Sequence, residues 1–145
     1  MAITTAMCTS FKSELLGGVH DLDSNSIRIA LIKASPSGTY GASTTNYSDV
    51  TGNSDEASGT GYTSTGEVLA GAAITTSGTT AIVDFTNAQW TSSTISADGC
   101  IIFNASQSNK AIAVIDFSGT KTSTNGTFTV QFPAAGASTA IIRIA

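Results

Sequence analysis

Short runs of alternating apolar and polar residues, separated by turn-forming residues, recur along most of this chain. From residue 62 onward they return at intervals of 10 to 16 residues. A period of two places successive side chains on opposite faces of a strand, and many short strands divided by turns are typical of all-β domains. We therefore predict an all-β fold, a β-sandwich or a Greek-key barrel, in which residues 1–145 form a single domain.

The runs also predict where the strands lie. In Ser26–Lys33, Ile27, Ile29 and Leu31 alternate with Arg28, Ala30 and Ile32, so we expect one inner face and a partly covered outer face. The other predicted strands are Glu67–Thr75, Thr79–Phe85, Gly99–Asn104, Ala111–Ser118, Thr127–Phe132 and Ala140–Ile144.

Two dipeptides predict hairpin turns between these strands. Asn125-Gly126 is typical of a type I′ turn, in which both central residues need a positive φ. Ser77-Gly78 predicts a second hairpin between its neighbouring strands.

Residues 1–18 have a helical pattern in place of the strand pattern of the rest of the chain, and they predict a short N-terminal helix. Thr5 or Thr9 is a suitable cap, and Gly17-Gly18 ends the pattern. Met7, Phe11 and Leu15 fall on one apolar stripe. A helix this short is marginal alone, so it must dock either on its own β-domain or on a partner.

Residues 34–61 predict a long surface loop. Gly, Ser, Thr, Asn and Pro dominate this segment, and Tyr40, Tyr47 and Val50 are its apolar anchors. Loops of this length inside a compact domain are usually functional or mobile. We therefore expect this segment to make surface contacts.

The composition argues against an enzyme. Only 11% of the residues are charged and there is one histidine, whereas 23 Thr and 20 Ser are present. Most enzyme chemistry depends on His, Asp, Glu, Lys and Cys side chains. We expect a structural or binding module that needs no cofactor.

The few candidate chemical sites each fail a spacing test. Asp21–Asn25 resembles the start of a calcium loop, but Ser26 stands where the loop needs Gly and Ile32 where it needs Glu. No sequence motif supplies a nucleophile for His20. Gly59-Thr-Gly61 lacks the lysine of a phosphate-binding loop.

Two acidic residues leave an alternative open. Asp84 and Asp116 would act as a glycosidase pair if both faced one cleft. The favoured interpretation places each at an exposed or capped strand position.

Charge and hydropathy limit the partners. The net charge is −4 and the six cations are scattered, so we expect no direct contact with nucleic acid. No apolar run reaches the roughly 18–20 residues of a membrane span, and the first residues lack a secretory signal. Cys8 and Cys100 are then expected to be free thiols in a protein made in a cytoplasm.

Four segments resemble a group of small virion structural proteins of tailed bacteriophages. These are Ala2–Leu16, Ser58–Tyr62, Ser106–Phe117 and Phe132–Ala145, so the resemblance covers most of the chain outside residues 34–57. It implies a protein of the virion, made in the host cytoplasm. The implied role is a capsid cement (decoration) protein that binds the assembled major capsid protein and stabilises the head. A head–tail or tail component is the alternative.

We expect such a protein to be a homo-oligomer, a dimer or a trimer. Its contact elements would be the segment Ala2–Leu16 and the loop Ser35–Gly61, with a Ser/Thr-rich surface that offers hydrogen bonds to the partner. The candidate contact residues are Phe11, Leu15, Tyr40, Tyr47 and Tyr62. A second hypothesis is a glycan- or receptor-binding module of a fibre. In that case Trp90, Tyr40 and Tyr62 would supply the stacking faces.

Overall fold

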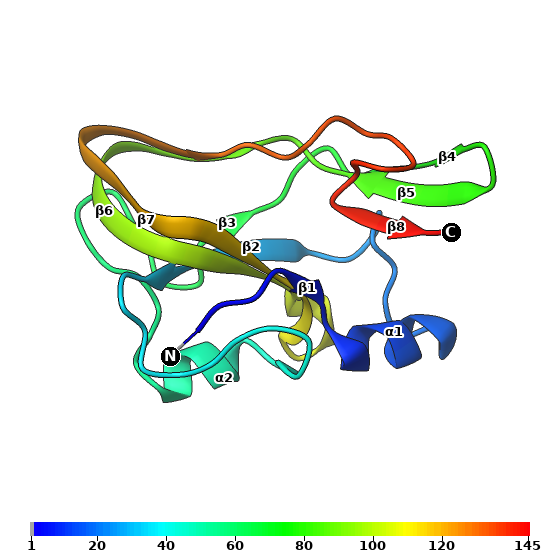
Figure 1. Cartoon of the computed structure of the whole chain (residues 1–145), viewed down its shortest axis with the longest axis horizontal. Coiled ribbons are helices and arrows are strands. Elements are labelled where there is room, and N and C mark those ends of the chain that lie inside the picture. The colour runs from blue at the N-terminus through cyan, green and yellow to red at the C-terminus, as the bar shows by residue number, and fades with distance from the viewer. Residues whose placement is uncertain (1) are drawn as a thin grey trace.

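Two antiparallel sheets form the framework of the protein (Figure 1). The computed structural model describes residues 2–145. The larger sheet has the strand order β1-β7-β6-β2-β3 and the smaller one β4-β5-β8. The strands are β1 (Ala6–Met7), β2 (Ile27–Lys33), β3 (Glu67–Val68), β4 (Ala73–Ser77), β5 (Thr80–Asp84), β6 (Ala88–Asn104), β7 (Lys110–Val130) and β8 (Ile142–Ile144). The helices are α1 (Thr9–Leu16), α2 (Ser48–Gly52) and a single 3-10 turn, η1 (Ala105–Gln107). The predicted all-β class with a short N-terminal helix is confirmed.

A long hairpin of β6 and β7 dominates the larger sheet. It pairs Ala88 with Val130 at one end and Asn104 with Lys110 at the other. The predicted strand Gly99–Asn104 is therefore only the end of β6. The predicted strands Ala111–Ser118 and Thr127–Phe132 are parts of one strand, β7, apart from the last two residues.

The prediction of a hairpin turn at Asn125-Gly126 is wrong. Both residues lie inside β7, where the register with β6 shifts near Ser93. Asn125 has the positive φ of 48° that its sequence suggested, but Gly126 does not share it. The left-handed residue produces a bulge that bends the long hairpin, and the chain continues in the same strand.

The predicted strand Glu67–Thr75 is in fact divided between the two sheets. Its first residues form β3, which pairs with β2, and its last residues belong to β4. The predicted turn after Ser77 is confirmed, because Ser77 pairs with Thr80 across a two-residue loop in which Gly78 has φ 60°. Gly at the first central position suits a tight hairpin turn.

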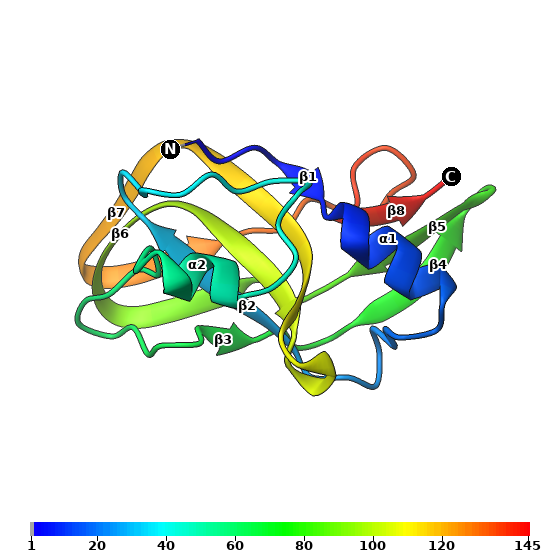
Figure 2. The ribbon, with the colours of Figure 1, turned by 90° about the horizontal axis from the view of Figure 1, so that it is seen from below.

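Strand β2 lies between β6 and β3 and is covered on both faces. Consecutive residues such as Ile29 and Ala30, which point to opposite faces of the strand, are both fully buried. The cover on one face comes from the segment 34–61, which carries α2 and lies beneath the larger sheet in Figure 1 and across it in Figure 2. The outer face of β2 is thus more completely buried than predicted, and residues 34–61 act as a structural layer.

Helix α1 docks on the protein's own sheet. Phe11 is fully buried in the core, and Gly17 and Gly18 end the helix with backbone bonds to Ser13 and Leu15. Neither predicted threonine caps it, because the N-cap is Cys8 and no side-chain cap bond forms. Of the two docking alternatives, the structure shows the intramolecular one.

Candidate functional site: an apolar groove beside helix α1

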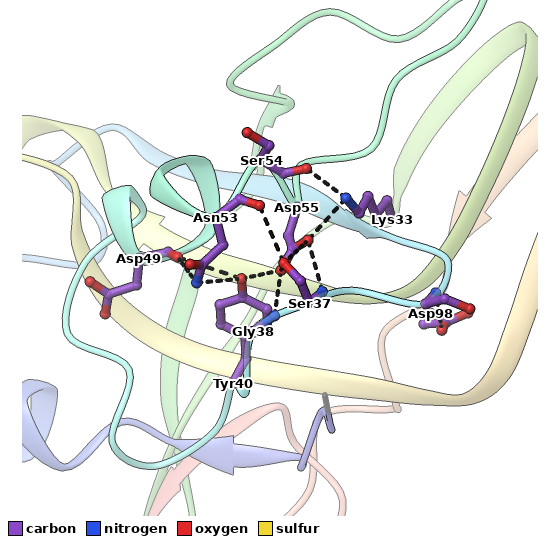
Figure 3. Close-up of polar contacts among 10 residues, drawn as sticks. Lys33, Ser37, Gly38, Tyr40, Asp49, Asn53, Ser54, Asp55 and Asp98 are labelled. Atoms are coloured by element: carbon purple, nitrogen blue, oxygen red, sulfur yellow. Dashed lines mark hydrogen bonds and ion pairs between the residues drawn. The ribbon is translucent and has the colours of Figure 1, made fainter.

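A buried carboxylate fixes the segment 34–61 in place. The Asp55 side chain is fully buried and accepts hydrogen bonds from the backbone N–H groups of Ser37 (3.0 Å) and Gly38 (2.8 Å). Tyr40 donates its hydroxyl at 2.6 Å and Lys33 forms an ion pair at 3.1 Å. Figure 3 shows these groups, all from positions 33 to 40, converging on Asp55 near the other end of the segment.

The charge of Asp55 is stabilised where it lies. Burial raises the pKa of this carboxyl group, but the bonds from Ser37, Tyr40, Gly38 and Lys33 outweigh burial and hold the pKa well below its usual value. Burial and the Asp55 contact raise the pKa of Tyr40 to about 12. The groups around Asp55 therefore use their hydrogen-bonding atoms on one another, and we assign this cluster a structural role.

A second cluster surrounds Glu56, the next residue. Its carboxylate accepts bonds from the hydroxyls of Tyr47 (2.6 Å), Tyr62 (2.9 Å) and Ser64 (2.8 Å). The Tyr62 hydroxyl also accepts the N–H of Leu31. Burial and the adjacent Glu56 charge raise the pKa of Tyr62 far above its usual value, so this phenol stays protonated. The Glu56 cluster joins the segment 34–61 to β2.

The proposed aromatic anchors are placed differently from the prediction. Phe11, Tyr40 and Tyr47 are 0%, 2% and 7% exposed, so they belong to the core and present no side chain to a partner. Tyr62 is half-buried and packs on the core. The tyrosines of residues 34–61 pack on one face of the larger sheet. There Tyr47 stacks on Phe103, with ring centroids 4.5 Å apart.

Leu15 is half-buried beside the core and remains partly accessible. Trp90 is 1% exposed and packs between Tyr62 and Phe128. The stacking faces that the glycan-binding hypothesis assigned to Trp90 and Tyr40 are therefore turned into the protein.

His20 lies in a closed network. Its Nε2 is 2.8 Å from a Glu14 carboxylate oxygen and its Nδ1 is 3.0 Å from the Asn104 amide nitrogen. Because an amide nitrogen only donates, Nδ1 accepts, and Nε2 carries the proton that it donates to Glu14. Burial raises the pKa of Glu14, but the bonds from His20 and Lys110 together lower it below its usual value. Both ring nitrogens are used within the fold, which leaves neither for a substrate.

The remaining polar candidates also have structural partners. Asp21 accepts the N–H of Ser24, and the Asn25 N–H bonds back to the Asp21 carbonyl, so this segment is a turn before β2. Asp84 and Asp116 lie in different sheets, and each accepts a nearby backbone N–H. Among residues 2–145 no cluster of three or more His, Cys, Asp or Glu side chains is arranged to hold a metal ion.

The two cysteines are unpaired and buried, as the sequence suggests. Gly59 and Gly61 lie in a turn that packs against β6, where a Cβ on Gly59 would clash with the Thr94 carbonyl oxygen. In the part of the chain that the structure describes, no helix has the length and apolarity needed to cross a bilayer.

An apolar groove lies between α1 and the smaller sheet. We call it the α1 groove. Its volume is about 440 Å³. It is lined by Leu15 of the helix, Leu22 of the following turn and one face of the smaller sheet, formed by Ile74, Val83, Ile142 and Ile144.

Exposed apolar side chains gather at this groove. Leu16 is 91% exposed at the end of α1, and Ile74 and Ile144 of the lining are 53% and 50% exposed. Leu16 is not itself part of the lining but directly follows the lining residue Leu15. Val68, the fourth large exposed apolar residue among residues 2–145, lies in a different element, β3. Clustered exposed apolar side chains mark interaction sites, whereas scattered ones do not.

A larger hollow of about 550 Å³ runs along β7, but its character differs. Its large apolar residues, such as Phe128 and Phe132, are buried or half-buried. Its exposed border consists of Lys121, Gln131, Pro133 and threonines. Because its exposed residues are large and apolar, we favour the α1 groove over the hollow along β7 as a protein-binding surface.

Of the residues that line the α1 groove, the sequence pointed only to Leu15, a candidate contact residue on the apolar stripe of the helix. The exposure of Ile74 and Ile144 depends on how β4 and β8 pair with β5. Local sequence does not contain that information.

Comparison with protein-family models, curated proteins and solved structures found no match. The functional assignment therefore depends on the site itself and on the sequence resemblance described above.

Proposed function

We propose that this protein is a structural component of a tailed-phage virion, a cement protein that binds the assembled capsid through the α1 groove. The observation that carries the proposal is the exposure of Ile74 and Ile144 in the lining of an open apolar groove, with exposed Leu16 next to the lining residue Leu15. Burying such side chains against a partner is worth about 1.5–3 kcal/mol each. The two polar side chains in the lining, His20 and Asp21, both make hydrogen bonds within the fold.

The resemblance of the sequence to small virion proteins supports the major capsid protein as the partner. A protein that binds only the assembled lattice stabilises it by mass action, as a ligand stabilises a folded state. The net charge of −4 suits contact with protein better than contact with the packaged nucleic acid.

Co-sedimentation with assembled capsids tests this proposal. Ile144→Glu places a charge in the groove lining and Leu16→Glu places one beside it, and we expect capsid affinity to fall about tenfold or more. Val68→Glu is the matched control, because Val68 is 51% exposed but outside the groove. It should bind like the unmodified protein.

The possible results separate two kinds of error. If all variants bind capsids equally, the α1 groove is not the contact. If the unmodified protein binds isolated tails and not heads, the cement role is wrong and the head–tail or tail alternative is correct.

A further inference from the structure

Strand β4 is an open edge without the usual protection against strand pairing. It is the outer strand of the smaller sheet, and residues 73–76 are exposed on both faces. Its sequence, Ala-Ile-Thr-Thr-Ser, contains β-branched residues and no charge or proline. Proteins usually block such an edge, because its free N–H and C=O groups bind another strand.

The terminal strands at the other three edges of the two sheets, and the part of β7 that extends beyond β1, have blocking features. Strands β1 and β3 have only two residues each. The part of β7 beyond β1 carries Lys121 and is bent at Ser118 and Asn125, which have positive φ. Strand β8 carries Arg143 at its centre, so two copies paired there would oppose like charges.

The backbone of β4 is complementary to itself in one register. Ser77 and Thr80 flank a two-residue turn and so form a hydrogen-bonded pair, after which the pairs alternate. Ile74 and Thr76 therefore direct their N–H and C=O groups away from β5. Two antiparallel copies centred on Thr75 would match Ile74 of each copy with Thr76 of the other, which satisfies all of these groups.

We propose that β4 pairs with β4 of a second copy of this chain about a two-fold axis at Thr75. The pairing joins two three-stranded sheets into one of six strands. It opposes Thr75 with Thr75, and cross-strand threonine pairs are favourable. With no charge on the strand, no like charges meet. A contact of one short strand gives a weak dimer whose population depends on concentration.

The proposed dimer does not depend on the proposed function, but it determines how the α1 grooves of the two copies are arranged. Ile74 and Val83 form a pair whose side chains lie on the groove face of the smaller sheet. A two-fold axis perpendicular to the sheet places both copies' grooves on the same side. The dimer would present two contact surfaces to one partner lattice, which increases avidity.

Sedimentation over a concentration series tests the dimer with two disrupting variants. The unmodified protein should move from the mass of one 14.6 kDa chain towards that of two. Thr76→Pro removes an outward N–H that β5 does not use, and Thr75→Lys opposes two charges at the axis. Both should remain monomeric, whereas Thr122→Lys, at an exposed position of β7, should still dimerise.

Disulfide trapping tests the register. Directly opposed residues in a non-hydrogen-bonded pair have Cα atoms about 4.5 Å apart, within the range that a disulfide spans. Thr75→Cys should therefore cross-link on the order of tenfold faster than Thr122→Cys, because pairing brings the two thiols together. Cys8 and Cys100 are fully buried and should not contribute.

Three results would overturn the proposal. The first is an unmodified protein that stays monomeric while Thr75→Cys cross-links no faster than Thr122→Cys. The second is a dimer that persists in Thr75→Lys, since another surface would then form it. The third is a monomer whose capsid binding is lost in Thr75→Lys, which would assign the edge to a strand of the capsid protein. Leu16→Glu leaves β4 intact, so failure of the capsid proposal would not affect the dimer result.

Discussion

At the scale of single residues, Asp55 has the largest organising effect. One fully buried carboxylate binds two backbone N–H groups, a tyrosine hydroxyl and a lysine, and these come from positions 33 to 40 of the chain. A polar segment that lacks regular structure over most of its length is held as a defined layer in this way. The carboxylate is tolerated in the interior because its acceptor sites are filled.

Replacing Asp55 by Asn should destabilise the protein by about 3 kcal/mol. The amide keeps one acceptor oxygen but directs a donor at the N–H groups of Ser37 or Gly38. Urea unfolding measures the change, and Asp23→Asn, in an exposed turn, is the control and should shift stability by less than about 0.5 kcal/mol. Equal effects in the two variants would contradict the structural role of Asp55.

The same carboxylate predicts a pH dependence. Because its pKa is depressed in the folded state, its contribution is complete above the unfolded pKa of about 3.9 and is lost as pH falls towards the folded pKa. The difference in unfolding free energy between the unmodified protein and Asp55→Asn should be constant from about pH 7 to 5 and shrink below about pH 4. A difference unchanged down to pH 2 would argue that the charge of Asp55 is not what stabilises the segment.

At the scale of elements, the β6–β7 hairpin shows how bulges shape this protein. The hairpin is long and bent, and the register between β6 and β7 shifts at several points, including the neighbourhood of Ser93. Asn125 supplies left-handed backbone at that bend, with φ 48°. An Asn-Gly pair inside a strand therefore produces curvature, whereas the same pair between two strands would reverse the chain.

Substitutions at the Asn-Gly pair distinguish a bulge from a turn. Asn125→Val should cost roughly 1–2 kcal/mol, because a β-branched residue is strained at positive φ. Gly126→Ala should change stability by less than about 0.5 kcal/mol, since φ there is not positive and a Cβ would meet only the Thr124 carbonyl oxygen at 3.6 Å. In a type I′ turn both residues would need positive φ, so a large loss in Gly126→Ala would contradict the bulge. Thermal unfolding of the two variants provides the measurement.

At the scale of the whole molecule, one continuous cluster of buried residues includes both sheets and the N-terminal helix. Phe11 of α1, Val83 of β5 and Ile101 of β6 all belong to it. The α1 groove forms where the helix and the smaller sheet meet without closing fully over one another. The same helix therefore supplies a core residue, Phe11, and an exposed one, Leu16.

The two roles of α1 predict opposite responses. Phe11→Ala should lower the unfolding free energy by about 3–5 kcal/mol, because it leaves a cavity in the core. Leu16→Glu should leave stability nearly unchanged, since the side chain is almost entirely in solvent. Removing residues 2–16 should unfold the protein, which circular dichroism measures. A truncated chain that stays folded would show that α1 is an accessory to the domain.

Local patterns in the sequence determined the elements whose signals are local. Alternation located β2, the Ser77-Gly78 dipeptide located the β4–β5 hairpin, and Gly17-Gly18 located the end of α1, because backbone preferences and side-chain periodicity act over a few residues. The same preferences even gave the left-handed conformation of Asn125.

Only the tertiary structure decided what those elements do together. It joined predicted strands into β7, divided another between two sheets, and buried Tyr40 and Tyr47 while leaving Leu16 and Ile144 exposed. A residue's burial depends on which distant segment packs against it, and strand pairing in the smaller sheet joins residues far apart in the chain. The all-β class could therefore be predicted from the sequence, whereas the α1 groove and the open edge of β4 are consequences of packing.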